Sequence, residues 1–158
     1  MLTAELLREL LAYDPETGSF WWRVSRGNRA AGSGAASENF RCLSIKINGR
    51  NHKAHRLAWL YVHGEWPAGV IDHIDGNWRN NRLANLRDVT QLVNCQNRRT
   101  ATRNNWAGLL GVRARKYGFD ARIVVSGKSI YLGGFKTAEE AHTAYLQAKR
   151  QLHEGNTL

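Results

Sequence analysis

The sequence predicts an α+β protein built from two modules, and three observations lead to this prediction. Residues 1–97 mix leucine-rich segments at helical spacing with short β-branched and aromatic runs. Residues 106–135 hold three alternating runs that are separated by glycine-containing turns. An amphipathic segment with a capping box starts at Thr137. We therefore expect a front module of small strands and helices, a basic connector at 98–105, and a three-stranded antiparallel sheet packed on one helix at 106–158.

The N-terminal segment predicts a helix, a turn and a strand. Residues 3–12 place leucines on one face, and a threonine at the start can cap this helix. Residues 13–18 read Tyr-Asp-Pro-Glu-Thr-Gly and have the composition of a turn. The aromatic run at 19–24 is a strand in which Trp21 and Trp22 face opposite sides, so at most one of them is well buried.

A loop, a hairpin and a second helix are expected next. Residues 26–37 are rich in Gly, Ala, Ser and Arg; a solvent-exposed loop is the simpler interpretation, and a phosphate-contacting loop is the alternative. Residues 40–47 alternate as a strand, and the Asn48-Gly49 pair is a strong signal for a hairpin turn. The segment 54–63 has apolar residues at helical spacing and is followed by glycine and proline.

The most informative stretch runs from Val70 to Asn97. A short β-branched run ends in Asp72 and His73, and a polar loop rich in asparagine follows. Apolar residues then recur at helical or near-helical spacing, at Leu83, Leu86, Val89, Leu92 and Val93. The pattern predicts a strand that ends in a carboxylate and an imidazole, a looped excursion, and a helix that carries Asn94.

The side chains of this stretch favour phosphodiester chemistry. The carboxylate of Asp72 and the amide oxygen of Asn94 are hard ligands that suit Mg²⁺, Mn²⁺ or Ca²⁺, and two are enough for a cation that shares its coordination with phosphate. The imidazole of His73 can then act as the general base that takes a proton from an attacking water. Adjacent strand residues point to opposite faces, so Asp72 and His73 serve one phosphate only where the strand ends or is distorted.

Each of these residues also has a simpler interpretation. Asp72 and His73 can form a solvated turn pair, and Asn94 can be an ordinary residue on a helix surface. His55, at the start of the segment 54–63, is more often a packed or hydrogen-bonded histidine than a catalytic one. The combined order and spacing of the polar residues favours the chemical interpretation for the constellation, and the structural one for His55.

The stretch 70–97 resembles the HNH endonucleases of the ββα-metal superfamily, in their phage homing-endonuclease branch. The resemblance rests on Asp-His, Asn-Asn-Arg-Leu-Ala-Asn-Leu-Arg and Asn-x-x-Asn, which occur in the order of the family motif. It implies that Asp72 is a metal ligand and His73 the general base, and that Asn85 fixes the strand that bears the histidine. Asn94 then stands as a metal ligand on the helix, where many relatives have a histidine.

The same resemblance sets the limits of the first module. The lead-in from 13–18 to 55–59 is similar to the N-terminal part of phage HNH proteins. The resemblance therefore implies a nuclease module at 1–97 with its motif core at 70–97.

The predicted C-terminal sheet has one apolar face and one basic face. The first strand is expected at 108–115, and Ile130 and Leu132 of the third strand are expected to face the helix. The helix presents an apolar stripe of Ala141, Ala144, Tyr145, Ala148 and Leu152. The opposite face of the sheet carries Arg113, Arg115, Arg122 and Tyr131. Such a face fits the major groove of DNA, and a merely solvated basic surface is the alternative.

The C-terminal module resembles the Apetala-type, ethylene-response-factor DNA-binding domain. The matching motifs are Gly-Val at 111–112, Ala-Arg-Ile at 121–123, Leu-Gly-Gly-Phe at 132–135, and Ala-Glu-Glu-Ala with Ala-Tyr in the helix. The resemblance implies that the sheet reads DNA. Leu110 and Phe119 stand where that family usually has Arg and Trp, so its base specificity does not transfer.

The charge of the chain points to a polyanionic partner. The 158 residues carry a formal net charge of +10, and residues 98–158 hold 11 Lys and Arg against 4 Asp and Glu. We expect double-stranded DNA as the partner, and the sequence implies no protein partner. The candidate DNA contacts are Arg82, Arg87, Arg98, Arg99, Arg103, Arg113, Arg115, Arg122 and Tyr131.

Other classes of protein fit the sequence less well. Cys42 and Cys95 lie far apart and form neither a zinc signature nor a disulfide framework. The sequence has no apolar run of membrane-spanning length and no signal-peptide layout, so we expect a soluble cytoplasmic protein that binds no membrane.

The sequence thus predicts a metal-dependent DNA endonuclease of the homing type, with Mg²⁺ as the expected cofactor and Mn²⁺ as its alternative. Two other hypotheses stay open. The first is a non-catalytic DNA-binding or transcription-regulating protein built on a nuclease fold. The second is an RNA-directed protein, because basicity alone does not separate RNA from DNA.

Overall fold

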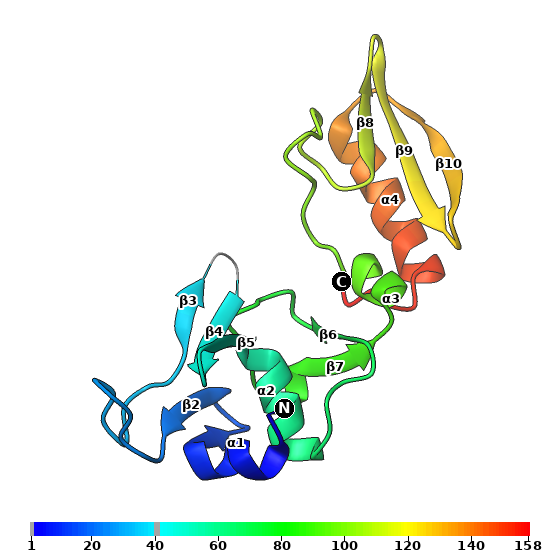
Figure 1. Ribbon diagram of the computed structural model, residues 1–158. Helices are drawn as coiled ribbons and strands as arrows, with labels where there is room; N and C mark the ends of the chain where they lie inside the picture. The colour runs from blue at the N-terminus through cyan, green and yellow to red at the C-terminus, as the bar shows by residue number, and fades with distance from the viewer. Residues whose placement is uncertain (1, 40–41) are drawn as a thin grey trace. The chain divides into compact units, whose positions relative to one another are not determined.

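The computed structural model describes residues 2–39 and 42–158, and it divides into two compact units at 1–91 and 92–158. Each unit combines helices with small antiparallel sheets, which confirms the predicted mixed α+β class (Figure 1). In the described part of the chain, no helix has the length and apolar character that a membrane crossing requires.

The first unit holds three small antiparallel sheets around the helix α2. Its elements are α1 (Ala4–Leu10), β1 (Leu11–Asp14), β2 (Ser19–Trp22), β3 (Ser37–Asn39), β4 (Cys42–Ile47), β5 (Arg50–Lys53), α2 (Ala54–His63), β6 (Val70–His73), the 3₁₀ turn η1 (Leu83–Asn85) and β7 (Leu86–Val89). The sheets pair β1 with β2, β4 with β3 and β5, and β6 with β7.

Local signals in the sequence account for several of these boundaries. The side chain of Thr3 accepts a hydrogen bond from the backbone of Leu6 and caps α1 as predicted. The helix stops earlier than predicted because Leu11 pairs with Trp22 in the first hairpin. Asn48 has a positive φ of 48°, as the tight turn between β4 and β5 requires. The predicted strand start at residue 40 lies outside the described residues.

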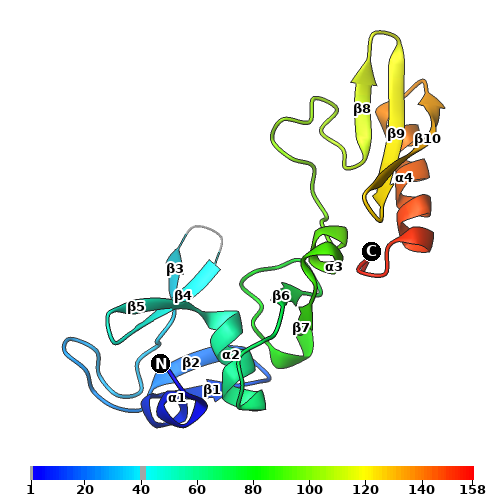
Figure 2. The same cartoon turned by 45° about the vertical axis from the view of Figure 1, so that its right-hand side comes forward.

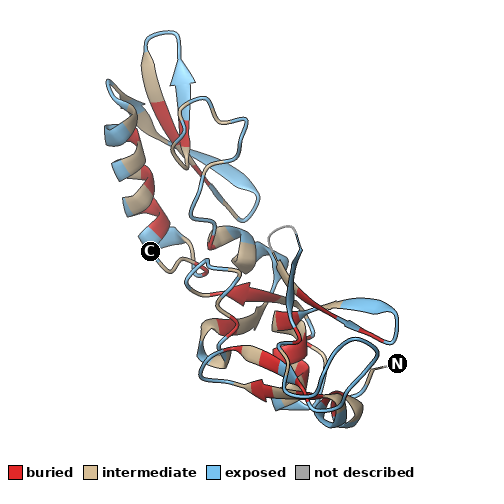
Figure 3. Ribbon diagram, turned by 90° about the vertical axis from the view of Figure 1, so that its left-hand side faces the viewer, coloured by how far each residue is buried: buried red, intermediate tan, exposed pale blue. Residues whose placement is uncertain are grey.

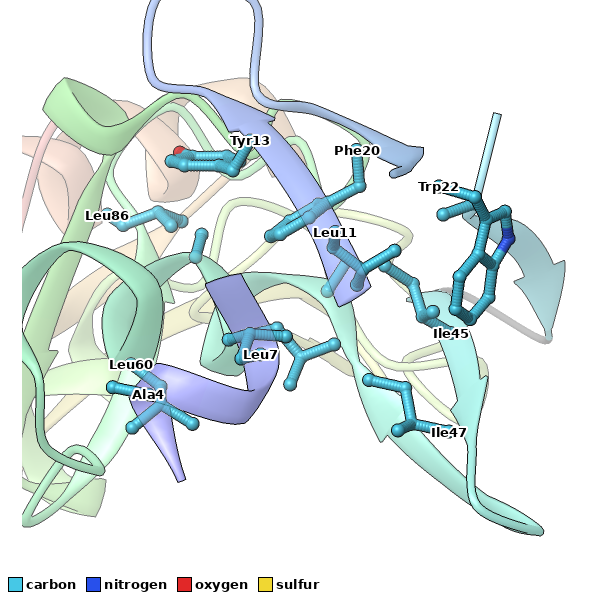
Figure 4. Packing of buried hydrophobic residues seen from close by; sticks show 14 of the residues in the cluster. Ala4, Leu7, Leu11, Tyr13, Phe20, Trp22, Ile45, Ile47, Leu60 and Leu86 are labelled. Atoms are coloured by element: carbon cyan, nitrogen blue, oxygen red, sulfur yellow. The ribbon is translucent and has the colours of Figure 1, made fainter. Parts of the chain in front are cut away.

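The hydrophobic core of the first unit is built on α2. Its residues Ala54, Leu57, Ala58 and Leu60 are buried. They join Leu7, Leu11, Phe20, Trp22, Ile45 and Ile47 in one cluster (Figure 4). Trp22 is buried while Trp21 is exposed, as the alternation of the strand predicts.

One sequence prediction is wrong in this unit. The helical spacing that starts at Leu83 does not form a helix, because residues 86–89 are the strand β7. This strand pairs with β6 in the register Asp72 to Arg87 and His73 to Leu86, and Leu86 is buried in the core. The gain from cross-strand pairing and burial therefore outweighs the local periodicity. The helix is confined to α3 (Gln91–Gln96).

The second unit is a three-stranded antiparallel sheet with a helix along one face (Figure 2). Its main elements are β8 (Val112–Arg115), β9 (Gly118–Val125), β10 (Lys128–Phe135) and α4 (Ala138–Leu152), with β9 in the centre of the sheet. Buried residues of α4 follow the side that meets the sheet (Figure 3). The predicted sheet-on-helix arrangement of the C-terminal module is confirmed.

Three details of this module differ from the prediction. The first strand begins at Val112 and not at Gly108, because Gly111 has a φ of +78° and its backbone lies against the ring of Tyr145. Ile130 pairs with the buried Ile123 but is 40% exposed, because β10 is an edge strand. Leu152 is also exposed, at the end of α4.

A buried lysine anchors the start of the connector. Lys149 is 1% exposed, and its Nζ donates a hydrogen bond of 2.6 Å to the carbonyl oxygen of Arg98. Burial lowers the pKa of Lys149, and the charge of Arg99 lowers it further. The side chain of Gln96 accepts a hydrogen bond from the backbone of Gly155. Residues 96–98 are therefore held by α4 and the C-terminal tail, and do not behave as a free linker.

The capping box of α4 gives a direct test of the second unit. Thr137 accepts from the backbone of Glu140, whose side chain accepts from the backbone of Thr137. We expect Thr137→Ala to lower the free energy of unfolding by about 1 kcal/mol. Thr143→Ala is the matched control, because Thr143 only bonds back to Glu139 within the helix and should change stability little. Urea unfolding followed by circular dichroism measures both, and equal effects would contradict the capping role.

Candidate active site

The strand β6 ends in the two residues expected to carry the chemistry. Asp72 is 5% exposed and His73 is 9% exposed, and His73 is the last residue of the strand. The strand-end position that the sequence argument required is therefore present. The two side chains nevertheless contact different neighbours: Asp72 bonds the guanidinium group of Arg87, and His73 lies against His55 and Asn81.

Asp72 is half of a cross-strand ion pair. The Nε and Nη2 atoms of Arg87 lie 2.9 Å and 2.8 Å from its Oδ2 atom. Both residues occupy paired positions of β6 and β7, so the sheet itself brings them together. Such a partner offsets part of the cost of burying the charge of a carboxylate. Arg87 was predicted to contact phosphate, and the structure gives it this additional role beside the metal-ligand candidate.

His73 is held by an asparagine that the sequence analysis did not single out. The Oδ1 atom of Asn81 lies 3.0 Å from Nε2 of His73, while the amide nitrogen of Asn81 donates to the carbonyl oxygen of Arg79. Because an amide oxygen only accepts, the neutral imidazole carries its proton on Nε2 and its lone pair on Nδ1. Asn81 is 1% exposed, so this contact is shielded from water.

A second histidine lies against the first. The rings of His55 and His73 meet edge to face, with centroids 5.1 Å apart and an interplanar angle of 89°. Burial lowers the pKa of His55 to about 3, and the charges of His73, Lys53 and Arg56 act in the same direction. His55 is therefore a neutral imidazole at ordinary pH. Its half-buried position in α2 agrees with the structural role that the sequence favoured.

Asn85 ties down the chain that follows His73. Its backbone oxygen accepts from the backbone of Ile74, and its Oδ1 atom accepts from that of Asp75 at 3.0 Å. Its amide nitrogen donates to Asp75 and to the backbone oxygen of Asn80. These contacts suit a residue that fixes the strand bearing the histidine, which is the role the resemblance implied.

Asp75 is the centre of this polar loop. Burial alone would raise the pKa of its carboxyl, but hydrogen bonds from Asn80, Asn77 and Asn85 outweigh that effect and lower the pKa. The asparagine-rich run is thus more than turn composition. Its side chains form a network around one carboxylate directly after His73.

The predicted metal ligands form a sparse set of oxygen donors. Asn94 is half-buried on α3 and belongs to the second unit, so its partnership with Asp72 stays a prediction. The described residues contain no group of three or more His, Cys, Asp or Glu side chains that could hold a metal. A carboxylate and an amide oxygen do not suit zinc, but they fit a hard cation that keeps several waters and binds phosphate.

Comparison with known proteins adds one finding. Residues 52–96 match a family model described as HNH endonuclease. The match runs from β5 to the end of α3 and includes the residues at the end of β6. No curated protein and no solved structure matches the chain. The match supports the nuclease part of the predicted resemblance.

The second unit follows the HNH segment with a basic sheet face. The register places Arg113 opposite Asp120, and Arg122 opposite Tyr131, on the side away from α4. Arg122 also lies over the ring of Tyr131, 5.5 Å from its centroid. The side chain of Arg115 completes this face. The structure thus brings together the four residues that the alternation pattern placed there.

A buried aspartate organises two of these arginines. Asp120 is 3% exposed, and its Oδ2 atom bonds Nε of Arg115 at 3.0 Å and Nε of Arg122 at 3.4 Å. Burial would raise the pKa of Asp120, but these partners outweigh it and lower the pKa. The sequence analysis missed Asp120. The sequence does contain a signal for it, because the alternation pattern places Asp120 on the same face of the sheet as the arginines.

The other predicted DNA contacts are exposed cations. Arg82, Arg98, Arg99 and Arg103 all lie at the surface. Arg99 also donates to the side chain and the carbonyl oxygen of Thr157, which holds it against the C-terminal tail. Their contact with DNA stays a prediction.

The depressed pKa of His55 predicts an acid-sensitive first unit. Unfolding lets this imidazole return to an ordinary pKa near 6.5, so the unfolded state binds the extra proton between about pH 6.5 and pH 3. The free energy of unfolding should therefore fall as the pH drops through this window, with a slope of up to about 1.4 kcal/mol per pH unit from this residue.

Urea titrations between pH 7 and pH 5 measure that slope. His55→Gln should flatten it, because the glutamine cannot bind a proton. The control is His63→Gln, which changes an exposed histidine at the end of the same helix and should leave the slope as in the wild type. Identical slopes in all three proteins would contradict the role of His55.

Proposed function

We propose that the protein is a metal-dependent DNA endonuclease of the homing type, which hydrolyses a phosphodiester bond. The observation that carries the proposal is the end of β6, where a buried carboxylate and an oriented imidazole adjoin inside a segment that matches the HNH endonuclease model. The asparagines after the strand support it, because Asn81 contacts the imidazole and Asn85 fixes the chain that follows it.

His73 is the proposed general base. With its proton held on Nε2 by Asn81, it takes a proton from a water molecule through Nδ1. The water oxygen then bonds to phosphorus, and the bond from phosphorus to the 3′ oxygen breaks. The 3′ oxygen leaves with a proton from solvent, which gives 5′-phosphate and 3′-hydroxyl ends.

Asp72 and Asn94 are the proposed ligands of a divalent cation, with Mg²⁺ preferred and Mn²⁺ as the alternative. Such a cation would stabilise the negative charge that develops on the phosphate and the departing oxygen. Asp72 would contribute a buried carboxylate to this role, and the cation would share that carboxylate with Arg87. In this proposal Arg87 either keeps its ion pair with Asp72 or turns towards a phosphate.

We propose that the C-terminal module binds duplex DNA, as an Apetala-type, ethylene-response-factor-like domain. Its basic face presents Arg113, Arg115, Arg122 and Tyr131 on a small twisted sheet. Asp120 orients two of the guanidinium groups, so that they are held in place before DNA arrives. The exposed arginines at 98–103 would add contacts to phosphates.

The general-base assignment predicts a specific loss of activity. His73→Ala should lower the rate of plasmid nicking with Mg²⁺ by about 10²- to 10⁴-fold, because water loses its proton acceptor. DNA affinity in a filter-binding assay should stay the same. His63→Ala is the control, since that exposed histidine lies outside the site. Unchanged cleavage by His73→Ala would refute the assignment.

The proposed DNA contacts of the basic sheet face predict that the loss of DNA binding depends on which arginine is removed. Arg113→Ala should weaken binding to a duplex and, if it contacts phosphate, reduce the slope of log affinity against log salt by about one. Arg150→Ala removes the same charge from the exposed side of α4, the helix that covers the other face of the sheet, and should leave that slope nearly unchanged. A salt titration by fluorescence anisotropy compares them. Equal losses would show that only net charge matters.

A non-catalytic DNA-binding protein is the second candidate, and one observation favours it. Arg87 neutralises the carboxylate that a metal would need. The two candidates differ in metal-dependent cleavage of random-sequence DNA: the nuclease leaves mappable ends with Mg²⁺ or Mn²⁺, whereas the binding protein leaves the duplex intact with every metal.

A further inference from the structure

The loop that holds His73 is itself held by the N-terminal hairpin. The hairpin consists of β1, β2 and the turn at 15–18, and lies more than fifty residues before the loop in the sequence. Three separate contacts join them, and all three fall on the backbone of residues 81–83. Together these contacts fix the position of the Asn81 backbone.

The first contact is a buried hydrogen bond from Tyr13. Its hydroxyl group donates to the carbonyl oxygen of Asn81 over 2.8 Å. Tyr13 is 8% exposed, and burial raises its pKa to about 12, with the charge of Asp14 adding to the effect. Its ring is fixed by Phe20 and Tyr61, whose centroids lie 4.6 Å and 5.6 Å away. In Figure 4 the hydroxyl oxygen points away from Phe20.

The second and third contacts come from the turn. The backbone of Leu83 donates to the carbonyl oxygen of Pro15 at 3.0 Å. Gly18 has a φ of +74°, and a Cβ atom at this position would lie 2.4 Å from the carbonyl carbon of Asn81. Only glycine allows this approach. Asp14 makes the turn rigid by accepting from the backbone of Glu16 and the hydroxyl group of Thr17.

The far end of the same asparagine reaches His73. The backbone of Asn81 is clamped by the hairpin, and its Oδ1 atom meets Nε2 of the imidazole at 3.0 Å. A shift of this peptide would therefore move the acceptor that keeps the imidazole proton on Nε2. Tyr13 lies behind this asparagine and acts on the histidine only through it.

We propose that the β1–β2 hairpin is a positioning brace for the general base, in which Tyr13 and Gly18 fix Asn81 and thereby the tautomer and tilt of His73. The proposal rests on the nuclease function proposed above. It assigns the N-terminal segment a part in the chemistry, in place of a purely structural one. Tyr13 is a positioning residue because it acts only through Asn81.

The decisive variant is Tyr13→Phe, which removes one oxygen atom and keeps the packed ring. We expect kcat for plasmid nicking to fall about tenfold with KM for DNA unchanged, because the base is misplaced while the binding surface is intact. The matched control is Tyr61→Phe, which removes a hydroxyl group from the neighbouring ring and leaves the bond between Tyr13 and Asn81 in place. Its kcat should equal that of the wild type.

A second readout does not depend on catalysis. Long-range ¹H–¹⁵N spectra of the full chain, with His73 assigned from His73→Gln, should show well-separated Nδ1 and Nε2 shifts in the wild type and averaged shifts in Tyr13→Phe. If the wild type does not cleave DNA, the nuclease proposal fails, yet these spectra still test the brace. Unchanged His73 shifts in Tyr13→Phe overturn the brace whether or not kcat falls.

Gly18→Ala tests the same brace from the turn. Its Cβ atom must displace the backbone of Asn81, so the His73 shifts should average as they do in Tyr13→Phe. Gly27→Ala is the control, since a Cβ atom there meets nothing within 4 Å at a similarly positive φ. Averaging in both glycine variants would overturn the proposal, because it would trace the effect to general backbone strain.

Discussion

The position of the loop that follows β6 depends on the burial of one amide side chain. Asn81 is almost completely enclosed, so its polar atoms must find partners within the protein. Its side-chain oxygen meets His73, its amide group meets Arg79, and its backbone carbonyl meets Tyr13. A loop without regular secondary structure thereby acquires a defined position. The hairpin and α2 supply the apolar surroundings that make each of these bonds costly to break.

Charge is distributed unevenly around this amide. Asp72 has the cation Arg87 beside it, while His73 lies against the neutral His55 and Asn81 and interacts with the carboxylate of Asp75. An arginine beside a buried carboxylate offsets part of the cost of burying its charge. Two adjacent residues of one strand thus receive the different environments that their proposed roles need. The pairing in β6 and β7 creates this difference, because it sets Arg87 beside Asp72 and Leu86 beside His73.

Sequence patterns predicted those parts of the structure that are determined locally. The helix at 54–63, the Asn48-Gly49 turn and the capping box at Thr137 depend on neighbouring residues, and all are present. The prediction of a helix from Leu83 to Val89 is wrong, because the periodicity of this stretch is ambiguous and its pairing with β6 is not local. Asp72 and His73 are predicted as site residues from the order of a motif. Asn81 could not be separated from its asparagine neighbours, because only burial distinguishes it.

The basic face of the second unit brings several like charges close together. Arg113, Arg115 and Arg122 repel one another on a sheet of three strands, and this repulsion opposes folding. Asp120 occupies the central strand and reduces the repulsion by pairing with two of them. Among the described residues, Arg113 has no ion pair. One face therefore combines two guanidinium groups that pair directly with Asp120 and a third, Arg113, whose charge acts on Asp120 from farther away. In the proposed complex with DNA, the two guanidinium groups held by Asp120 suit particular base edges, and Arg113 is the candidate for a phosphate contact.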